Sequence, residues 1–128
     1  MQTVRRGFDA FGRGEFDESL EGLAPNFEFH PSGRFMDTQP VYQGREGMRE
    51  FWRTFRDAWD DISIEIERID DLGDRVLTLG TFHGRTGGTS AEVRAESGWI
   101  HTFEDGLVVR MRAFATWREA IEAADLSE

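Results

Sequence analysis

The chain has 128 residues, of which 15 are arginine and none is lysine or cysteine, and its formal net charge is −10 at pH 7. Without lysine and cysteine, the chain can form no Schiff base, P-loop lysine contact, thiol nucleophile or thiolate metal site. The negative charge argues against a nucleic-acid partner, because neutralising phosphates takes a basic surface.

The length predicts one domain, residues 1–128, able to bury an ordinary apolar core. No apolar run approaches the roughly 20 residues of a membrane span. The first residues lead into a helical pattern and not into a signal peptide. We therefore expect a cytoplasmic protein that does not enter a membrane.

The N-terminal part predicts helices followed by a short strand. A first helix and a short helical turn are marked by apolar residues at helical spacing: Val4, Phe8 and Phe11, then Leu20 and Leu23. Pro25 ends the turn. A strand over 27–30 follows and carries His30 at its end, where Pro31 stops it.

A second helix is predicted to begin at Gly44, after a loop that contains Asp37. Its apolar stripe is Met48, Phe51, Trp52, Phe55 and Trp59. A histidine at a strand end, beneath an aromatic helix, indicates a small-molecule pocket. We interpret Asp37 as a solvated loop acid, with a place on a lid as the alternative.

The C-terminal half predicts a sheet. Residues 62–67 alternate between isoleucine and polar residues, as is typical of a strand with one wet face. Three long strands follow over 75–86, 91–104 and 107–117, with turns at 87–88 and 105–106, and residues 118–124 form a closing helical turn. Helices followed by antiparallel strands indicate an α+β fold.

The register of the first long hairpin predicts two different faces. Closing the hairpin around 87–90 pairs Phe82 with Ala95, Gly80 with Ser97, Thr78 with Trp99 and Val76 with His101. This aromatic face, with gaps at small residues, suits a concave wall around a ligand. The opposite face carries Leu77, Leu79 and Ile100, and we expect it to be buried in a homodimer. A one-residue slip would exchange the two faces.

The register of the last strand decides whether Arg112 faces the pocket. A two-residue turn at 105–106 pairs Trp99 with Arg112, whose guanidinium could then clamp a carboxylate. A three-residue turn pairs Trp99 with Ala113 and directs Met111 inward. The apolar set is the favoured cavity wall.

The order of these elements and motifs resembles the SnoaL-like proteins of the nuclear transport factor 2-like superfamily. The motifs are, in chain order, Arg6-Gly7-Phe8-Asp9-Ala10-Phe11, Arg13-Gly14-Glu15, Phe29-His30-Pro31-Ser32-Gly33, Tyr42-Gln43-Gly44-Arg45-Glu46-Gly47, Gly84-Arg85, Thr102-Phe103-Glu104-Asp105-Gly106 and Glu119-Ala120-Ile121-Glu122-Ala123-Ala124. The resemblance covers essentially the whole chain. It implies a cone-shaped α+β barrel, in which a strongly bent antiparallel sheet is wrapped by the N-terminal helices, and it implies pairing of two copies. Relatives include isomerases, cyclases, dehydratases and hydrolases, so the fold alone names no reaction.

His30 is the first candidate for catalysis. In the ketosteroid isomerases the general-base aspartate lies in an Asp-Pro-x-Gly stretch, which His30-Pro31-Ser32-Gly33 resembles with histidine in its place. Histidine can take up a proton near neutral pH. The isomerase's oxyanion-hole tyrosine and protonated aspartate would fall near Gly7 and Trp99, so steroid isomerisation is not expected. The alternative is that His30 only caps the strand.

His101 is the second catalytic candidate, because it falls on the predicted inner face and could form an acid–base pair with His30. A core histidine bonded to a carbonyl is the alternative. His83 is expected on the outer face. The side chains expected to bind a ligand, for most of which core packing is an equal explanation, are Tyr42, Trp52, Trp59, Phe82, Trp99 and Met111.

Two functions follow from these residues. The first is a cofactor-independent isomerase, cyclase, dehydratase or hydrolase that acts on an apolar or polyketide-like substrate with His30 as general base. The second is a non-catalytic ligand-binding or dimerising accessory domain. We expect a small apolar ligand, no organic cofactor and no metal, since three histidines without a His-x-x-x-His spacing offer a poor ligand set.

Overall fold

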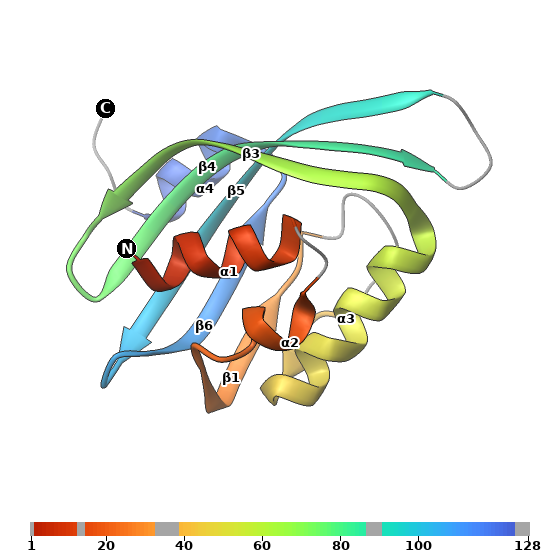
Figure 1. The fold of residues 1–128 in the computed structure, drawn as a ribbon. Helices are drawn as coiled ribbons and strands as arrows, with labels where there is room; N and C mark the ends of the chain where they lie inside the picture. Colours follow the sequence, from red (N-terminus) through yellow and green to blue (C-terminus); the bar gives the residue numbers. More distant parts are fainter. Residues whose placement is uncertain (1, 13–14, 33–38, 87–90, 125–128) are drawn as a thin grey trace.

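The computed structural model of the protein describes residues 2–12, 15–32, 39–86 and 91–124. The helices are α1 (Gln2–Gly12), α2 (Phe16–Ser19), α3 (Gly44–Ala58) and α4 (Trp117–Ala123), and the strands are β1 (Leu23–His30), β2 (Tyr42–Gln43), β3 (Trp59–Asp71), β4 (Arg75–Thr86), β5 (Glu92–Glu104) and β6 (Leu107–Phe114) (Figure 1). The predicted α+β class is confirmed. Among these helices, none is long and apolar enough to cross a bilayer.

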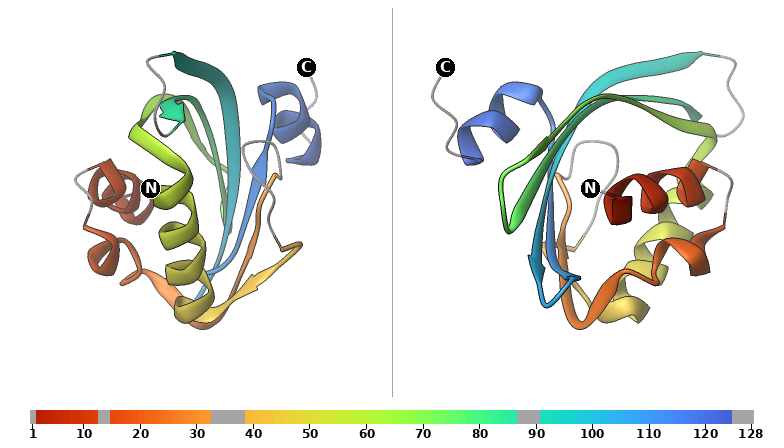
Figure 2. Two further views of the ribbon diagram at one scale, coloured as in Figure 1. Left: turned by 90° about the vertical axis from the view of Figure 1, so that its right-hand side faces the viewer. Right: turned by 60° about the vertical axis from the view of Figure 1, so that its left-hand side comes forward.

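The strands form one bent sheet with helices on both faces. The strand order is β2-β1-β6-β5-β4-β3, and neighbouring strands are antiparallel except β1 and β6, which run parallel. Figure 2 shows α1, α2 and α3 on the concave side of the sheet and α4 on the convex side. Over the described residues the sheet curls without closing, so the cone stays open.

The main core lies between the N-terminal helices and the concave face. Helix α3 contributes Met48, Phe51 and Phe55 at helical spacing, and the first long hairpin contributes Phe82 and Trp99. The predicted register of this hairpin is confirmed at all four pairs. The buried stripe of α3 therefore covers the face of the sheet that the sequence assigned to the pocket.

Two predicted helical ends are wrong. Trp59 does not extend the stripe of α3, because the backbone is already extended there (φ −130°, ψ 142°) and Trp59 begins β3. Leu23 and Pro25 belong to β1, since the short helix ends at Ser19 and Leu23 pairs with Val108 of β6. In both places an apolar residue keeps its place in the core while the backbone changes from helix to strand.

The convex face of the central hairpin is covered by the chain itself. Leu77, Leu79 and Ile100 are 0%, 3% and 3% exposed, and they pack with Ala120 and Ala124 at the inner side and end of α4. The expectation that these three side chains would lie open for a second copy is therefore wrong. A homodimer remains a prediction that rests on the resemblance alone.

A bulge in β6 sets the orientation of its last residues. The turn has two residues, Asp105 and Gly106, both with positive φ (52° and 80°), as expected of a tight hairpin. Between the pairs Phe103–Val108 and Thr102–Arg110 the register then shifts by one residue.

The shift pairs Trp99 with Ala113 and not with Arg112. Met111 is consequently buried and Arg112 is exposed. The favoured orientation is confirmed, although a bulge and not a three-residue turn produces it.

Gly98 controls how closely α4 approaches the sheet. A methyl group at this position would lie 2.6 Å from Cβ of Ala120. We expect Gly98→Ala to lower the free energy of unfolding by about 1–3 kcal/mol, because α4 must move away from the leucines that it covers. Urea denaturation measures the change.

Gly7→Ala is the control for this substitution. A methyl group at Gly7 meets nothing within 4 Å in α1, so alanine should leave stability unchanged or raise it by up to about 1 kcal/mol. If Gly98→Ala is as stable as Gly7→Ala, then α4 does not depend on this close approach.

Candidate functional site

Two neighbouring cavities lie between the N-terminal helices and the concave face of the sheet. The inner cavity has a volume of about 60 Å³ and is lined by Phe8, Phe11, Phe29, Pro31, Ser32, Phe51, Trp52, Phe55, Ile64, Phe82, Ser97, Trp99, Met111, Ala113 and Phe114. The outer cavity has a volume of about 310 Å³ and is lined by Val4, Arg6, Gly7, Phe8, Phe11, Glu18, Glu21, Gly22, Leu23, Met48, Trp52, His101, Gly106, Leu107, Val108 and Met111. The outer cavity reaches the size range of small-molecule sites.

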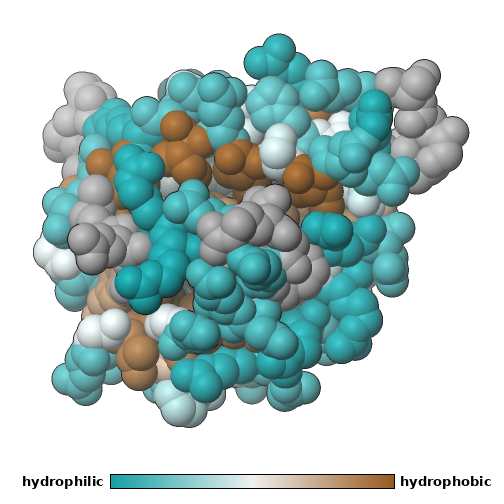
Figure 3. Space-filling model, in the orientation of Figure 1, coloured by the Kyte–Doolittle hydropathy of each residue, from teal (hydrophilic) through white to brown (hydrophobic). Residues whose placement is uncertain are grey.

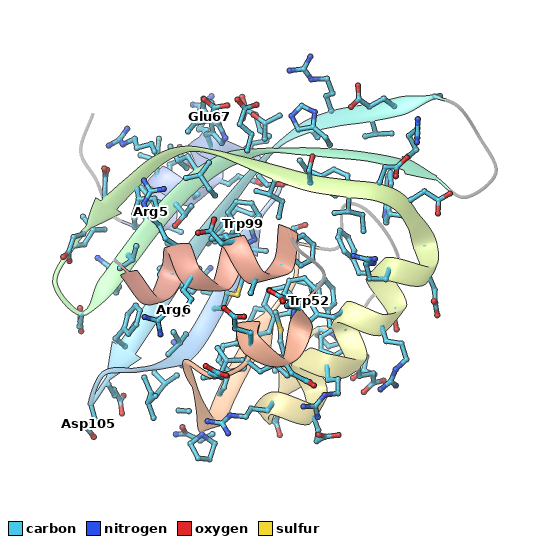
Figure 4. The ribbon with its side chains drawn as sticks, viewed as in Figure 1. Arg5, Arg6, Trp52, Glu67, Trp99 and Asp105 are labelled. Carbon is cyan, nitrogen blue, oxygen red and sulfur yellow. The ribbon has the colours of Figure 1, made fainter. Side chains whose placement is uncertain are left out.

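Aromatic side chains from α1 and α3 form the walls that the two cavities share, and β5 adds Trp99 to the inner cavity. The ring of Phe8 meets Trp99 edge to face, with ring centroids 4.9 Å apart, and Phe11 lies 4.5 Å from Trp52. Figure 4 shows Trp52 between α1, α2 and α3, and Trp99 where α1 crosses the sheet. These contacts place a largely apolar site under α1.

The outer cavity also carries polar groups. Arg6 on α1, Glu18 on α2 and Glu21 in the turn after α2 contribute charged side chains, while His101 lies on the sheet. Arg6 forms no ion pair with any residue that the structure describes. In Figure 4, Arg6 and its neighbour Arg5 leave α1 in opposite directions, with Arg6 on the side of β6.

His101 is the buried titratable group of this site. It is 6% exposed, and within the described part of the chain Nδ1 has no hydrogen-bond partner. Burial lowers the pKa of His101 to about 4, so the ring is neutral at pH 7. A neutral imidazole offers one donor and one acceptor, and the tautomer decides which of the two Nδ1 is.

His30 does not face these cavities. Phe27 and Phe29 of β1 are buried on the concave side, and the alternation of the strand therefore turns Glu28 and His30 to the convex side. There Nε2 of His30 lies 3.2 Å from Oε1 of Glu28, and the histidine side chain is 34% exposed. The expectation of a pocket-facing His30 is wrong in orientation, and the two histidines form no pair because they lie on opposite faces of the sheet.

The expected ligand-binding residues divide into two groups. Trp52, Phe82, Trp99 and Met111 line one or both cavities, whereas Tyr42 and Trp59 line neither. Tyr42 instead packs at a tilt against Phe29, meets Phe51 edge to face and accepts a hydrogen bond from the backbone N–H of Gln39 (3.2 Å). Trp59 meets Phe82 edge to face, 5.1 Å between ring centroids.

Other predicted polar residues lie away from the cavities. His83 is on the convex face, as expected, with its ring nitrogens 3.5 Å from carboxylate oxygens of Glu65 and Glu92. Asp37 falls outside the described residues. In the ranges that the structure covers, no three histidine, aspartate or glutamate side chains gather into a metal-binding group, and a metal-free protein stays a prediction.

Sequence reasoning missed the contribution of α1. It placed Phe8 and Phe11 on the apolar stripe of a helix but assigned neither to the pocket, and it gave Arg6 no role. The stripe was the available signal, because an amphipathic helix must cover some apolar surface. Which surface α1 covers depends on the curl of the sheet.

A sequence model of the SnoaL-like domain matches residues 4–111. The chain belongs to the SnoaL-like domain family. No curated protein matches it in sequence.

Solved structures with low sequence identity share the fold. A nuclear transport factor 2-like protein of unknown function from Burkholderia pseudomallei is 21% identical, with a TM-score of 0.81 over 95% of this chain and 94% of that one. TerC, co-crystallised with polyporic acid, is 20% identical, with a TM-score of 0.80 over 94% and 96%. A ketosteroid isomerase-like protein from Catenulispora acidiphila, in complex with trimethylamine, is 10% identical, with a TM-score of 0.79 over 98% and 94%.

The buried ring of His101 makes stability depend on pH. Its pKa is about 4 in the folded chain against 6.5 for an ordinary histidine, so between these values the unfolded chain binds a proton that the folded chain does not. Stability should therefore fall as pH drops from 6.5 toward 4, by up to about 3 kcal/mol from this group.

His101→Gln should reduce this loss, because glutamine does not titrate. Urea denaturation of the native protein and of His101→Gln at pH 7 and pH 4.5 measures the loss of stability in each. His30→Gln is the control and should lose as much stability as the native protein. Equal pH dependence in the native protein and His101→Gln would show that His101 is not buried as a neutral ring.

Proposed function

We propose that the protein binds a small, largely apolar molecule in the outer cavity, with a polar group of the ligand at His101. The observation that carries the proposal is the Nδ1 atom of His101, which is buried, neutral at pH 7 and without a partner among the described residues. A buried polar atom costs stability unless it is hydrogen-bonded, and a ligand supplies the missing partner when the ring turns Nδ1 toward the cavity that His101 lines.

The shape and lining of the site support a ligand with an apolar body. The walls are mostly aromatic and aliphatic side chains, and the charged groups Arg6, Glu18 and Glu21 come from α1, from α2 and from the turn after α2. Few polar groups in an apolar hollow are typical of small-molecule sites, because they orient the ligand while apolar burial holds it. Two proteins of the same fold are seen with small molecules, polyporic acid and trimethylamine, which supports a small-molecule ligand for this fold.

The binding proposal is tested with two matched probes, 2-naphthol and naphthalene, which differ by one hydroxyl group. We expect 2-naphthol to bind about fivefold more tightly than naphthalene, because its hydroxyl group forms a hydrogen bond with His101. Quenching of tryptophan fluorescence reports binding, since Trp52 and Trp99 lie in the cavity walls.

His101→Phe removes the ring nitrogens while it keeps an apolar wall. It should make the two probes bind equally, whereas His30→Phe should preserve the preference for 2-naphthol. If the preference for 2-naphthol survives in His101→Phe and is lost in His30→Phe, the polar contact is made by His30 and the proposal is wrong.

Proton transfer is the second candidate function, and the orientation of His101 into the cavity favours it. A neutral imidazole can accept a proton from a carbon acid and return it, without a cofactor, as an isomerase, cyclase or dehydratase requires. The lowered pKa makes His101 a weak base, so this chemistry needs a substrate whose proton is already acidic. His30 remains the alternative base for a substrate that binds the convex side of β1.

Exchange of the α-protons of 2-tetralone in D₂O tests the catalytic candidate by NMR. If His101 is the base, the protein accelerates exchange and His101→Gln lowers the rate by about 10²-fold, while His30→Gln has little effect. Loss of exchange in His30→Gln alone would restore His30 as the base. No acceleration by the native protein would leave ligand binding as the function.

A further inference from the structure

Phe8 lies across the boundary between the inner and outer cavities. Its ring contacts Trp99, which lines only the inner cavity, and lies 5.9 Å from the ring of His101, which lines only the outer cavity. Trp99 and His101 are two residues apart on β5 and face the same side of the sheet. The Phe8 ring therefore covers the step from one cavity to the other.

The inner cavity is too small to hold a ring by itself. Its volume is about 60 Å³, whereas a cavity that binds benzene measures about 150 Å³. Its lining nevertheless includes aromatic faces that would stack on a ring, among them Phe82 and Trp99. This wall becomes available to a ligand only when the space is joined to the outer cavity.

We propose that Phe8 is a partition that sets the length of the ligand, so that the native site selects compact molecules and excludes elongated ones. This inference rests on the proposed ligand-binding function. A molecule with its polar group at His101 and a second ring over Trp99 must displace the ring of Phe8. A compact fused-ring molecule fits the outer cavity and leaves Phe8 in place.

The position of Phe8 makes it suitable for this role. Phe8 is only half-buried and belongs to α1, so its removal leaves the fully buried side chains of the core, such as Phe27 and Phe82, in place. The other residues that line both cavities are Phe11, Trp52 and Met111. Of the four, Phe8 is the one with ring contacts to both Trp99 and His101 among the described residues.

The test compares 2-naphthol, which is compact, with 4-phenylphenol, which carries the same hydroxyl on a longer frame. In Phe8→Ala we expect the ratio of the two dissociation constants to shift by about tenfold or more toward 4-phenylphenol, because its second ring enters the space that Phe8 filled. Phe8→Leu, a milder change should Phe8→Ala fold poorly, should shift the ratio in the same direction by less.

One control separates this effect from a general loosening of the protein. Phe103→Ala makes the same substitution at a half-buried phenylalanine that lines neither cavity. It should not change the ratio. An unchanged ratio in folded Phe8→Ala, or an equal shift in Phe103→Ala, overturns the partition.

The positions of xenon atoms in crystals held under xenon pressure test the partition without either probe, and therefore independently of the proposed function. If neither probe binds the native protein or any variant, the proposed function fails, but the partition still predicts two separate xenon sites in the native protein and one continuous site in Phe8→Ala. Two separate sites that persist in Phe8→Ala overturn the partition even if both probes bind.

Discussion

Side chains that follow one another along a β-strand point to opposite faces of the sheet, and this alternation decides which groups of the protein reach the cavities. On β1, Phe29 packs into the concave core, so His30 must lie on the convex side. On β5, Trp99 and His101 share the concave face, and Ile100 between them lies under α4. The backbone thereby selects one histidine for the cavity before any chemistry is considered.

The same alternation explains why one additional residue in β6 matters. Val108 and Met111 are both buried in the main core although they are three positions apart, and a regular strand would turn them to opposite faces. The bulge between Val108 and Arg110 of β6 restores the alternation from Met111 onward. Without it, Arg110 and Arg112 would face an aromatic hollow, where an unpaired guanidinium is costly.

Hydrophobic side chains are also visible at the surface of the molecule, along β3 above α1 and below α1 over β6 and β1 (Figure 3).

The sequence carried enough information for the elements and for one register. The pairing of β4 with β5 could be predicted because aromatic and small residues alternate in step along both strands. The burial of Leu79 under α4 could not, because a seven-residue helix gives no sign of where it packs. The bulge in β6 was hidden for a similar reason, since the turn that precedes it is an ordinary two-residue turn.

The candidate site was predicted in part. Aromatic residues of the cavity walls, such as Trp52 and Trp99, followed from helical and strand spacing. The orientation of His30 could not be predicted, because a likeness of four residues to a catalytic stretch fixes the residue types and leaves the direction of the side chain open. The role of Phe8 required the curl of the sheet beneath α1, a long-range property that short sequence patterns do not encode.

The chain has three histidines, of which His101 lines the outer cavity, while His30 and His83 lie on the convex side beside carboxylates. Titrating 2-naphthol into the protein and following the three imidazole C–H resonances by NMR tests the central claim directly, because each ring reports on its own surroundings. We expect the resonances of His101 to shift as the cavity fills and those of His30 and His83 to stay unchanged. A shift of the His30 resonances with those of His101 unchanged would contradict it and place the functional site on the convex side of β1.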